Sequence, residues 1–443
     1  MLKTTGKRRW VIVFLLAFGV IVNYFDRTNL SVAGTLMSKE FNLSPAQMGI
    51  LFSSFIWTYA LLQFPVGAML DKIGVKWVIR VATAIWTIAT YMTAVVSGFG
   101  LILLSRLLLG ASEAPCFPAN AKATGYWFPK HERARAIALF DSESKLANAI
   151  GVAFVSLVVA QWGWRGGFYV TALLSLLYTV MFWAIYRDPK EDKKLSKEEY
   201  DYIVEGGAQA EGQASGSFIS NVGYLLKQRK VWGVIIGYGA YGYAWYLFLT
   251  WLPNYLATQM HMSLIKTGWY ASIPWFVGFL TELTISGWLV DRLVTKGYNP
   301  MLVRKVMLVV GMMLGLAVIG AAFTTNPNVA VTYISIALGG LVVTSGIAFQ
   351  IPTFIAPKGT TGTMMGLLTF GNSGMGILAP IITGFIVGAT GSFAMAFIVA
   401  GIVLFIGILS YVFLLTDLDP IPDQDQVNMK QLAGQNKNIK FSS

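Results

Sequence analysis

Long apolar segments recur along the whole chain and restrict its possible folds more than any other feature. Each holds about 20 consecutive, mainly apolar residues, the length that a helix needs to cross about 30 Å of hydrocarbon. Charged residues make up 12% of the 443 residues, whereas a soluble domain carries about 25%. These properties predict an all-α integral membrane protein. The twelve predicted transmembrane helices are residues 10–34, 46–70, 77–97, 99–122, 134–160, 167–186, 230–255, 266–290, 302–324, 328–350, 361–388 and 391–415.

Lysine and arginine are concentrated in alternate loops between these spans, and the opposite loops hold few. Cytoplasmic loops of membrane proteins are enriched in these two residues, so the pattern predicts that both termini lie in the cytoplasm. The same placement accounts for the net charge of +12 without nucleic acid, which we exclude as a partner. The basic loops are residues 3–9, 72–80, 122–135, 187–230, 292–305 and the C-terminal tail.

A polar interruption separates the first six spans from the last six. Ser196 begins a segment with capping-box spacing, which predicts a short helix running towards Gly206 within this linker. Residues 67–72 and 287–292 are similar hexapeptides, each at the end of the second span of its half. Parallel repeats of this kind form pseudo-symmetric halves in transporters, with the binding site between them. We predict an N-terminal six-helix bundle, a cytoplasmic linker, a C-terminal six-helix bundle and a cytoplasmic tail, at residues 1–186, 187–229, 230–416 and 417–443.

Charged residues inside the predicted spans are the main functional signal. Asp26 and Arg27 are neighbours in the first span, and they point to different partners because adjacent residues lie about 100° apart on a helix. Arg106 and Glu113 are seven residues apart, so they share a face of the fourth span. Each such charge costs roughly 2.5–3.5 kcal/mol on insertion scales, and retained charges usually line a wet cavity. Arg106 and Glu113 are separated by about 10 Å along the axis, so each is expected to meet another helix, water or a ligand.

Further charges occur in the fifth and eighth spans, and the sequence leaves their roles open. Asp141 and Lys145 are four residues apart and could neutralise each other, or Lys145 could contact a bound anion. Glu143 lies between them. Glu282 could pair with Lys145 across the bundle, or it could be a protonated side chain at the wall.

The loop after the second span, Gly67-x-x-x-Asp71-Lys72, is similar to the signature loop of the major facilitator superfamily. Residues 23–30, 112–118, 127–133 and 251–256 resemble the anion:cation symporter family within it, whose members include bacterial hexonate, glucarate and hexuronate carriers. The resemblance covers nearly the whole chain. We expect the signature loop and its repeat to hold the cytoplasmic gate shut, through Gly67, Asp71, Lys72, Asp291 and Arg292.

The resemblance also implies roles for individual residues. Asp26 and Glu113 match the protonatable carboxylates of the family, and Arg27 matches the arginine that meets the substrate carboxylate. Arg106 matches the partner of the fourth-span carboxylate, and Tyr59 matches a cavity tyrosine.

Other positions that are expected to contact substrate depart from the family pattern. Ser144 stands where sugar-acid relatives carry a glutamine, and Phe349 follows Ala348 where they have Thr-Trp. Thr369 replaces an asparagine, and Asn372 lies one turn later. Together with Lys145, these residues complete the predicted substrate site, and they leave the particular acid open.

A charge count over Asp26, Arg27, Arg106 and Glu113 predicts symport. The four charges sum to zero when both acids are ionised. Protonation of the acids deprives two guanidinium groups of counter-charges, so that an organic anion becomes their favoured partner. We therefore expect a proton-coupled importer of a small organic anion, in first place a sugar acid (hexonate, hexuronate or aldarate).

Several alternatives were weighed against this function. Another carboxylate or a sulfonate could be the substrate. A drug/proton antiporter is less favoured because the fifth span, from Leu146 to Ala160, lacks the Gly-Pro-rich motif of such exporters. A channel or nutrient sensor would differ by failing to accumulate its ligand. The sequence shows no catalytic constellation, phosphate-binding loop or metal-ligand cluster, so we expect no enzyme activity, cofactor or metal. A monomer in the lipid bilayer of the cell inner membrane is expected.

Overall fold

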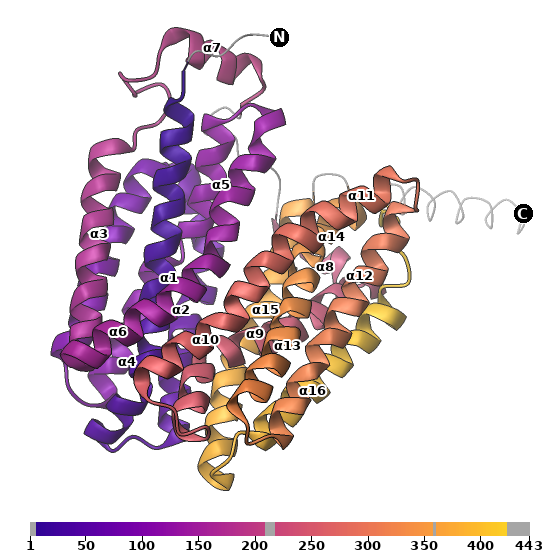
Figure 1. Ribbon diagram of the computed structural model, residues 1–443. Coiled ribbons are helices and arrows are strands. Elements are labelled where there is room, and N and C mark those ends of the chain that lie inside the picture. The colour runs from indigo at the N-terminus through magenta and orange to yellow at the C-terminus, as the bar shows by residue number, and fades with distance from the viewer. Residues whose placement is uncertain (1–5, 209–217, 358–359, 423–443) are drawn as a thin grey trace, which may run out of the picture.

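The computed structural model describes residues 6–208, 218–357 and 360–422, and all regular elements within these ranges are helices. Figure 1 shows two bundles, one built from the N-terminal half of the chain and one from the C-terminal half. The bundles lie close together at one end and diverge towards the end that carries α7. We call the latter the linker end and the former the opposite end.

The N-terminal bundle contains six membrane crossings. Residues 114 and 115 interrupt the fourth crossing between two helices, so that Glu113 is the last residue before the break. The last helix has 56 residues, or about 84 Å at 1.5 Å per residue, which is far too long for one crossing. It forms two crossings because the chain reverses at Gly163, whose φ of 68° is open to glycine. The helices are α1 (Arg8–Phe41), α2 (Pro45–Lys72), α3 (Val75–Val95), α4 (Phe99–Glu113), α5 (Cys116–Trp127) and α6 (Lys130–Ile185).

The C-terminal bundle also contains six crossings, several of them built from consecutive helical pieces. The eighth crossing changes from α-helix to π-helix at Glu282. The pieces are α9 (Arg229–Thr258), α10 (Leu264–Thr281), η1 (Glu282–Leu289), α11 (Val290–Thr295), α12 (Pro300–Gly315), η2 (Leu316–Phe323), α13 (Pro327–Ala348), α14 (Ile351–Ile355), α15 (Thr361–Thr390), α16 (Ala394–Leu409) and η3 (Ser410–Leu414).

The expected all-helical membrane architecture is confirmed, although length and hydropathy alone identify fewer than the twelve expected spans. Eight helices in the described ranges are long and apolar enough to span a membrane, or nine if the bent α2 is included. The two crossings of α6 are counted as one helix by these criteria. The helix α9 and the chain from α10 to α11 carry many tyrosine, tryptophan and polar residues, which lower their hydropathy.

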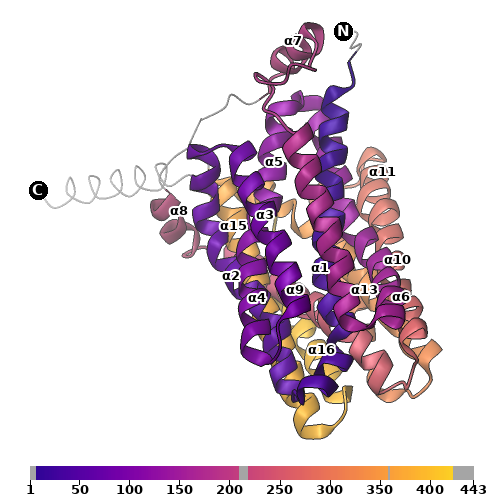
Figure 2. The ribbon, with the colours of Figure 1, turned by 90° about the vertical axis from the view of Figure 1, so that its left-hand side faces the viewer.

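The linker helix begins and ends where the sequence predicts. α7 (Lys197–Glu205) starts after Ser196, whose Oγ accepts the amide proton of Glu199, and it ends at Gly206. Arg9 at the start of α1 pairs with Glu199 of α7 at 2.9 Å and with Glu132 of α6 at 2.8 Å. The linker is therefore fastened to the N-terminal bundle, as Figure 2 shows from the side. A second linker helix, α8 (Phe218–Leu225), follows.

At the opposite end the two bundles meet in a close seam. α1 packs against α9, α2 against α15, and α6 against α10. A Cβ added to Gly49 would lie 2.4 Å from the carbonyl oxygen of Pro380, and one added to Gly384 would lie 2.5 Å from that of Pro45. Glycine therefore permits a backbone approach between the bundles that any side chain would prevent.

Candidate functional site

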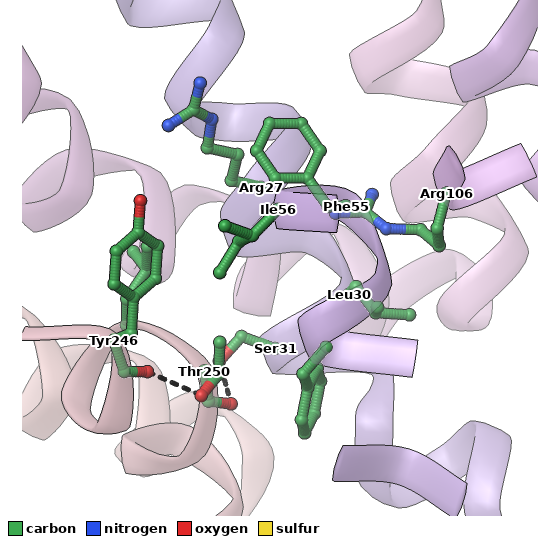
Figure 3. A pocket seen from close by; sticks show the side chains of 10 residues that line it. Arg27, Leu30, Ser31, Phe55, Ile56, Arg106, Tyr246 and Thr250 are labelled. Carbon is green, nitrogen blue, oxygen red and sulfur yellow. Dashed lines mark hydrogen bonds between the residues drawn. The ribbon is translucent and has the colours of Figure 1, made fainter. Parts of the chain in front are cut away.

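A cavity with about 350 Å³ of empty space, part of it open to solvent, lies between the bundles. Its wall combines three residues each from α1, α2 and α9 with one from α4. The residues from α1, α2 and α9 each follow i, i+3, i+4 spacing, so each helix presents a single face. Figure 3 shows the lining residues, which are Arg27, Leu30, Ser31, Phe52, Phe55, Ile56, Arg106, Tyr246, Leu249 and Thr250.

Arg27 is held by one carboxylate and three aromatic rings. Its Nε donates to Oε2 of Glu113 at 3.0 Å, and both side chains are buried. The guanidinium carbon lies 5.0 Å from the ring centre of Tyr24, 4.6 Å from that of Phe55 and 4.9 Å from that of Tyr59. These cation–π contacts keep the guanidinium stabilised even when its carboxylate partner is neutral.

Arg106 lines the same cavity without a carboxylate partner in hydrogen-bond contact. It is 3% exposed, and its Nε and Nη1 make no hydrogen bond among the described residues. Its guanidinium carbon lies 5.5 Å from the ring centre of Phe55. The separation of about 10 Å along the helix predicted that Arg106 and Glu113 each meet another helix, water or a ligand, and Glu113 does pair with Arg27 of α1. The partnership of Arg106 with Glu113 that the resemblance implied is not present as a hydrogen bond among the described residues.

Asp26 points away from the cavity into the core of the N-terminal bundle. It is fully buried, and Oδ2 accepts hydrogen bonds from Nε1 of Trp86 on α3 and, at 2.9 Å, from Oγ of Ser175 on α6. The prediction that Asp26 and Arg27 face different partners is confirmed. Both donors are neutral and both reach Oδ2, whereas Oδ1 has no hydrogen-bond partner within the described structure.

Lys145 and Glu282 join the two bundles. Nζ of Lys145 on α6 lies 3.0 Å from Oε1 of Glu282, which is the first residue of the π-helical segment after α10. Of the two possibilities for Glu282, pairing across the bundle is the one observed. π-Helical turns are rare and frequently occur at functional sites. The side chain of Asp141, the alternative partner of Lys145, lies outside the described residues.

The remaining predicted substrate contacts divide into near and distant groups. Tyr59 stacks on Phe55 beside Arg27, and Ser144 is buried on α6 next to Lys145. Thr369 donates a hydrogen bond to Met365 of its own helix, and Asn372 packs against Gly242 of α9. Phe349, at the end of α13, is 51% exposed and does not line the cavity.

The signature loop makes its contacts inside the N-terminal bundle. Asp71 at the end of α2 pairs with Lys122 of α5, and Lys72 is exposed. A Cβ added to Gly67 would touch nothing within 4 Å. Arg292 lies over the ring of Trp288 at 4.8 Å, and the side chain of Asp291 lies outside the described residues. The gating role of these five residues stays a prediction.

Several residues that build the site were not predicted from the sequence. Phe55 is one turn before Tyr59, so the same-face spacing could have identified it. Ser31 and Thr250 have no charge to mark them, yet Oγ of Ser31 donates to the carbonyl of Thr250 at 2.8 Å and so joins α1 to α9. Trp86 and Ser175, which hold Asp26, gave no sequence signal because their proximity depends on how α3 and α6 pack.

Within the described ranges, no group of three or more histidine, cysteine, aspartate or glutamate side chains could hold a metal ion. The site therefore offers two guanidinium groups, two buried carboxylates and aromatic rings. Guanidinium groups are the side chains best suited to bind carboxylates and other oxyanions.

Comparison with known proteins gives a consistent assignment. The sequence profile of the Major Facilitator Superfamily matches residues 16–380. An uncharacterized transporter of Bacillus subtilis, YybO, is 38% identical over 95% of this chain and 97% of its own length. A D-galactonate transporter of Escherichia coli is 30% identical over 93% of this chain and 97% of its own. A probable galactarate/D-glucarate transporter of Escherichia coli is 32% identical, with 98% and 97% covered.

A solved structure shows the same fold. A bacterial homologue of the human lysosomal transporter Spinster, in an inward-facing and occupied conformation, superposes with a TM-score of 0.73 over 93% of this chain and 97% of that chain. The two sequences are 18% identical, so this likeness concerns the fold alone.

Proposed function

This chain belongs to the major facilitator superfamily of membrane transporters, and from that premise we propose that it is a proton-coupled symporter of a small organic anion. The relatives named as D-galactonate and galactarate/D-glucarate transporters favour a sugar acid as the substrate class. Another small carboxylate or sulfonate is the second candidate, because guanidinium groups accept either kind of oxyanion.

The observation that carries the proposal is the Arg27–Glu113 ion pair at the cavity wall. While Glu113 is ionised, it occupies Nε of Arg27 and lowers the affinity of the cavity for an anion. Protonation of Glu113 removes that competition, and the surrounding rings keep Arg27 in place as a cation. A substrate carboxylate can then take the position that Glu113 held, through hydrogen bonds from the guanidinium fork.

Coupling follows because each ligand favours the other. A bound anion near Glu113 stabilises the protonated acid, and the protonated acid favours the anion, by the same coupling free energy. Asp26 is the second candidate proton carrier, since its buried carboxylate has neutral donors for partners. A cavity whose charges are cancelled is less costly to close off from water, so the loaded carrier can change its orientation.

The membrane placement is part of the same proposal. The alternation of basic loops supports both termini in the cytoplasm and a location in the cell inner membrane. With that orientation the glycine seam seals the extracellular side, and the present conformation is inward-facing. We further propose that the monomer is the functional unit, because each chain has its own cavity between its two bundles.

The test separates proton coupling from binding. Ligands are first identified by a thermal-shift screen of the purified protein against sugar acids, hexuronates, aldarates and small sulfonates. In proteoliposomes, an inward proton gradient should drive accumulation by the wild type. Glu113→Gln, which mimics the protonated acid, should lose this accumulation but retain substrate exchange between equal pH values.

Glu40→Gln is the matched control, because Glu40 is a carboxylate at the opposite end of α1 and pairs with Arg165 outside the cavity. It should accumulate substrate normally. Gradient-driven accumulation by Glu113→Gln at the wild-type level would refute the role of Glu113. Substrate efflux driven by an inward proton gradient would instead identify an antiporter.

A further inference from the structure

We propose that the physiological substrate is a dianion, with one acid group bound by Arg27 and the other by Arg106, and that it is carried with two protons without net charge movement. This inference rests on the symport function proposed above and narrows its substrate class. It goes beyond that function by assigning Arg106 a direct contact with a second anionic group.

The geometry places two cations at one cavity with a single ring between them. The guanidinium carbons of Arg27 and Arg106 lie 4.6 Å and 5.5 Å from the centre of the same Phe55 ring. Figure 3 shows Phe55 between the two guanidinium groups. Since both groups border the same ring and the same cavity, a substrate with a few carbons between its acid groups can reach both.

Both arginines have buried guanidinium nitrogens without a hydrogen bond in the described structure, one in Arg27 (Nη2) and two in Arg106. Arg27 donates from Nε to Glu113, which serves as its exchangeable counter-charge. Arg106 is buried, yet its Nε and Nη1 make no hydrogen bond within the described structure. A buried donor without an acceptor destabilises a protein, and more so when it is charged. An oxyanion at Arg106 would remove that penalty.

The balance of charges in the cavity also favours a dianionic substrate, and this reasoning does not depend on hydrogen bonding. Asp26, Arg27, Arg106 and Glu113 sum to zero when ionised, and Lys145 is balanced by Glu282. With both acids protonated the site carries two positive charges. A monoanion leaves one of them uncompensated, whereas a dianion cancels both, and burial of an uncompensated charge is strongly unfavourable.

Apart from the two arginines, few groups in the cavity wall can bind the acid groups of a substrate. Apolar side chains from α1, α2 and α9 surround the arginines. The hydroxyl of Ser31 donates to the carbonyl of Thr250, and that of Thr250 donates to the carbonyl of Tyr246. These two hydroxyl protons are therefore already engaged, and the remaining polar groups of the wall are the two guanidinium groups and the hydroxyl of Tyr246.

The first test compares acids that differ in one charged group. Galactarate is paired with galactonate, and sulfoacetate with acetate, in binding assays on the purified protein. We expect at least a tenfold tighter binding of the dianion in at least one pair. In proteoliposomes, uptake of that dianion should follow an imposed pH gradient and should not change when a potassium diffusion potential is applied.

Three outcomes distinguish this inference from the proposed symport. Failure of a pH gradient to drive uptake of any acid refutes symport itself. Gradient-driven uptake of monoanions in preference to dianions refutes the dianion while symport stands. Dianion uptake that responds to membrane voltage refutes the neutral stoichiometry.

The second test assigns the second acid group to Arg106. Arg106→Gln should reduce dianion affinity to the monoanion level, at least tenfold, while monoanion affinity changes less than threefold. Arg106→Lys keeps the charge and should retain part of the dianion preference. An equal loss for both acids, or no loss for either, would show that Arg106 makes no specific contact. If Arg106→Gln fails to fold, the voltage measurement on the wild type still decides the charge of the substrate.

Discussion

The two bundles contribute unequally to the cavity, although they share a six-helix architecture and a repeated hexapeptide. The N-terminal bundle supplies both guanidinium groups of the wall and holds Glu113 beside Arg27, together with the rings that enclose Arg27. The C-terminal bundle supplies Tyr246, Leu249 and Thr250 from α9. The Arg27–Glu113 ion pair thus lies inside one bundle and does not depend on how the two bundles are placed relative to each other.

Contacts that cross between the bundles have a different character. Some are hydroxyl-to-carbonyl hydrogen bonds, such as Ser31 to Thr250 and Ser53 to Ile377, each at 2.8 Å. One is the buried ion pair of Lys145 and Glu282. Under the proposed function, the N-terminal bundle would bind the protons and the anion, and the crossing contacts would set the relative stability of the two orientations.

Among the variants that test the difference between the two bundles, Arg27→Lys should have the largest effect. Lysine keeps the charge but loses the planar fork that binds a carboxylate through two hydrogen bonds. A charge-assisted hydrogen bond is worth about 1.5–3 kcal/mol, so substrate affinity should fall about 10- to 100-fold. Isothermal titration against the best ligand checks the prediction. Unchanged affinity would remove Arg27 from the site and leave the asymmetry between the bundles without a functional meaning.

A charge swap at the crossing ion pair should have the next largest effect. Lys145→Glu places two carboxylates together in a buried position, and breaking a buried pair costs about 3–5 kcal/mol. Uptake should fall at least tenfold and Tm should decrease. The double variant Lys145→Glu with Glu282→Lys should recover much of both. If the swap restores Tm but not uptake, Lys145 has a role in transport beyond joining the bundles.

Phe349→Ala should have a much smaller effect on transport. The resemblance to sugar-acid carriers places a substrate contact here, but the side chain is 51% exposed and outside the cavity wall. We expect less than a twofold change in the KM for uptake. The matched variant is Phe55→Ala, which removes the ring between the two arginines and should change KM at least tenfold. Equal changes in KM for the two variants would contradict the conclusion that the N-terminal bundle supplies most of the substrate site.

The smallest expected effect concerns the linker clasp at Arg9 and Glu132. Burial by itself raises the pKa of Glu132, but hydrogen bonds from Arg9 and Tyr202 lower it, and the net pKa lies below the ordinary value of 4.5. A lowered folded-state pKa stabilises the clasp above pH 4.5, and that stabilisation is lost as the pH falls through the lowered pKa. Proteolysis of the linker in detergent should therefore accelerate below pH 4.5 in the wild type. The variant Glu132→Gln should show fast cleavage already at neutral pH, and a wild-type rate in this variant would exclude the clasp.

Features of the site that depend on a single helix could be predicted from the sequence, whereas features that depend on packing between helices could not. Arg27 and Arg106 were identified from the sequence because a charge in an apolar span is unfavourable wherever the helix packs. The carboxylate partner of each arginine was not identified. The resemblance implied that Glu113 partners Arg106, whereas in the structure Glu113 pairs with Arg27. Pairing depends on the rotation of α1 against α4, which neighbouring residues in the sequence do not specify. Phe349 shows the same limit, since a matching motif position does not ensure that a side chain faces the cavity.

By itself the sequence determined the all-helical membrane architecture, the division into two halves and the four charged residues of the N-terminal bundle. These follow from hydropathy and from the cost of burying charge, which act along a single helix. The tertiary structure alone decided that Arg27 takes Glu113, that Asp26 turns into the bundle core, and that Phe55 lies between two guanidinium groups. Each of these depends on contacts between helices distant in sequence, which the residue pattern of a single helix does not specify.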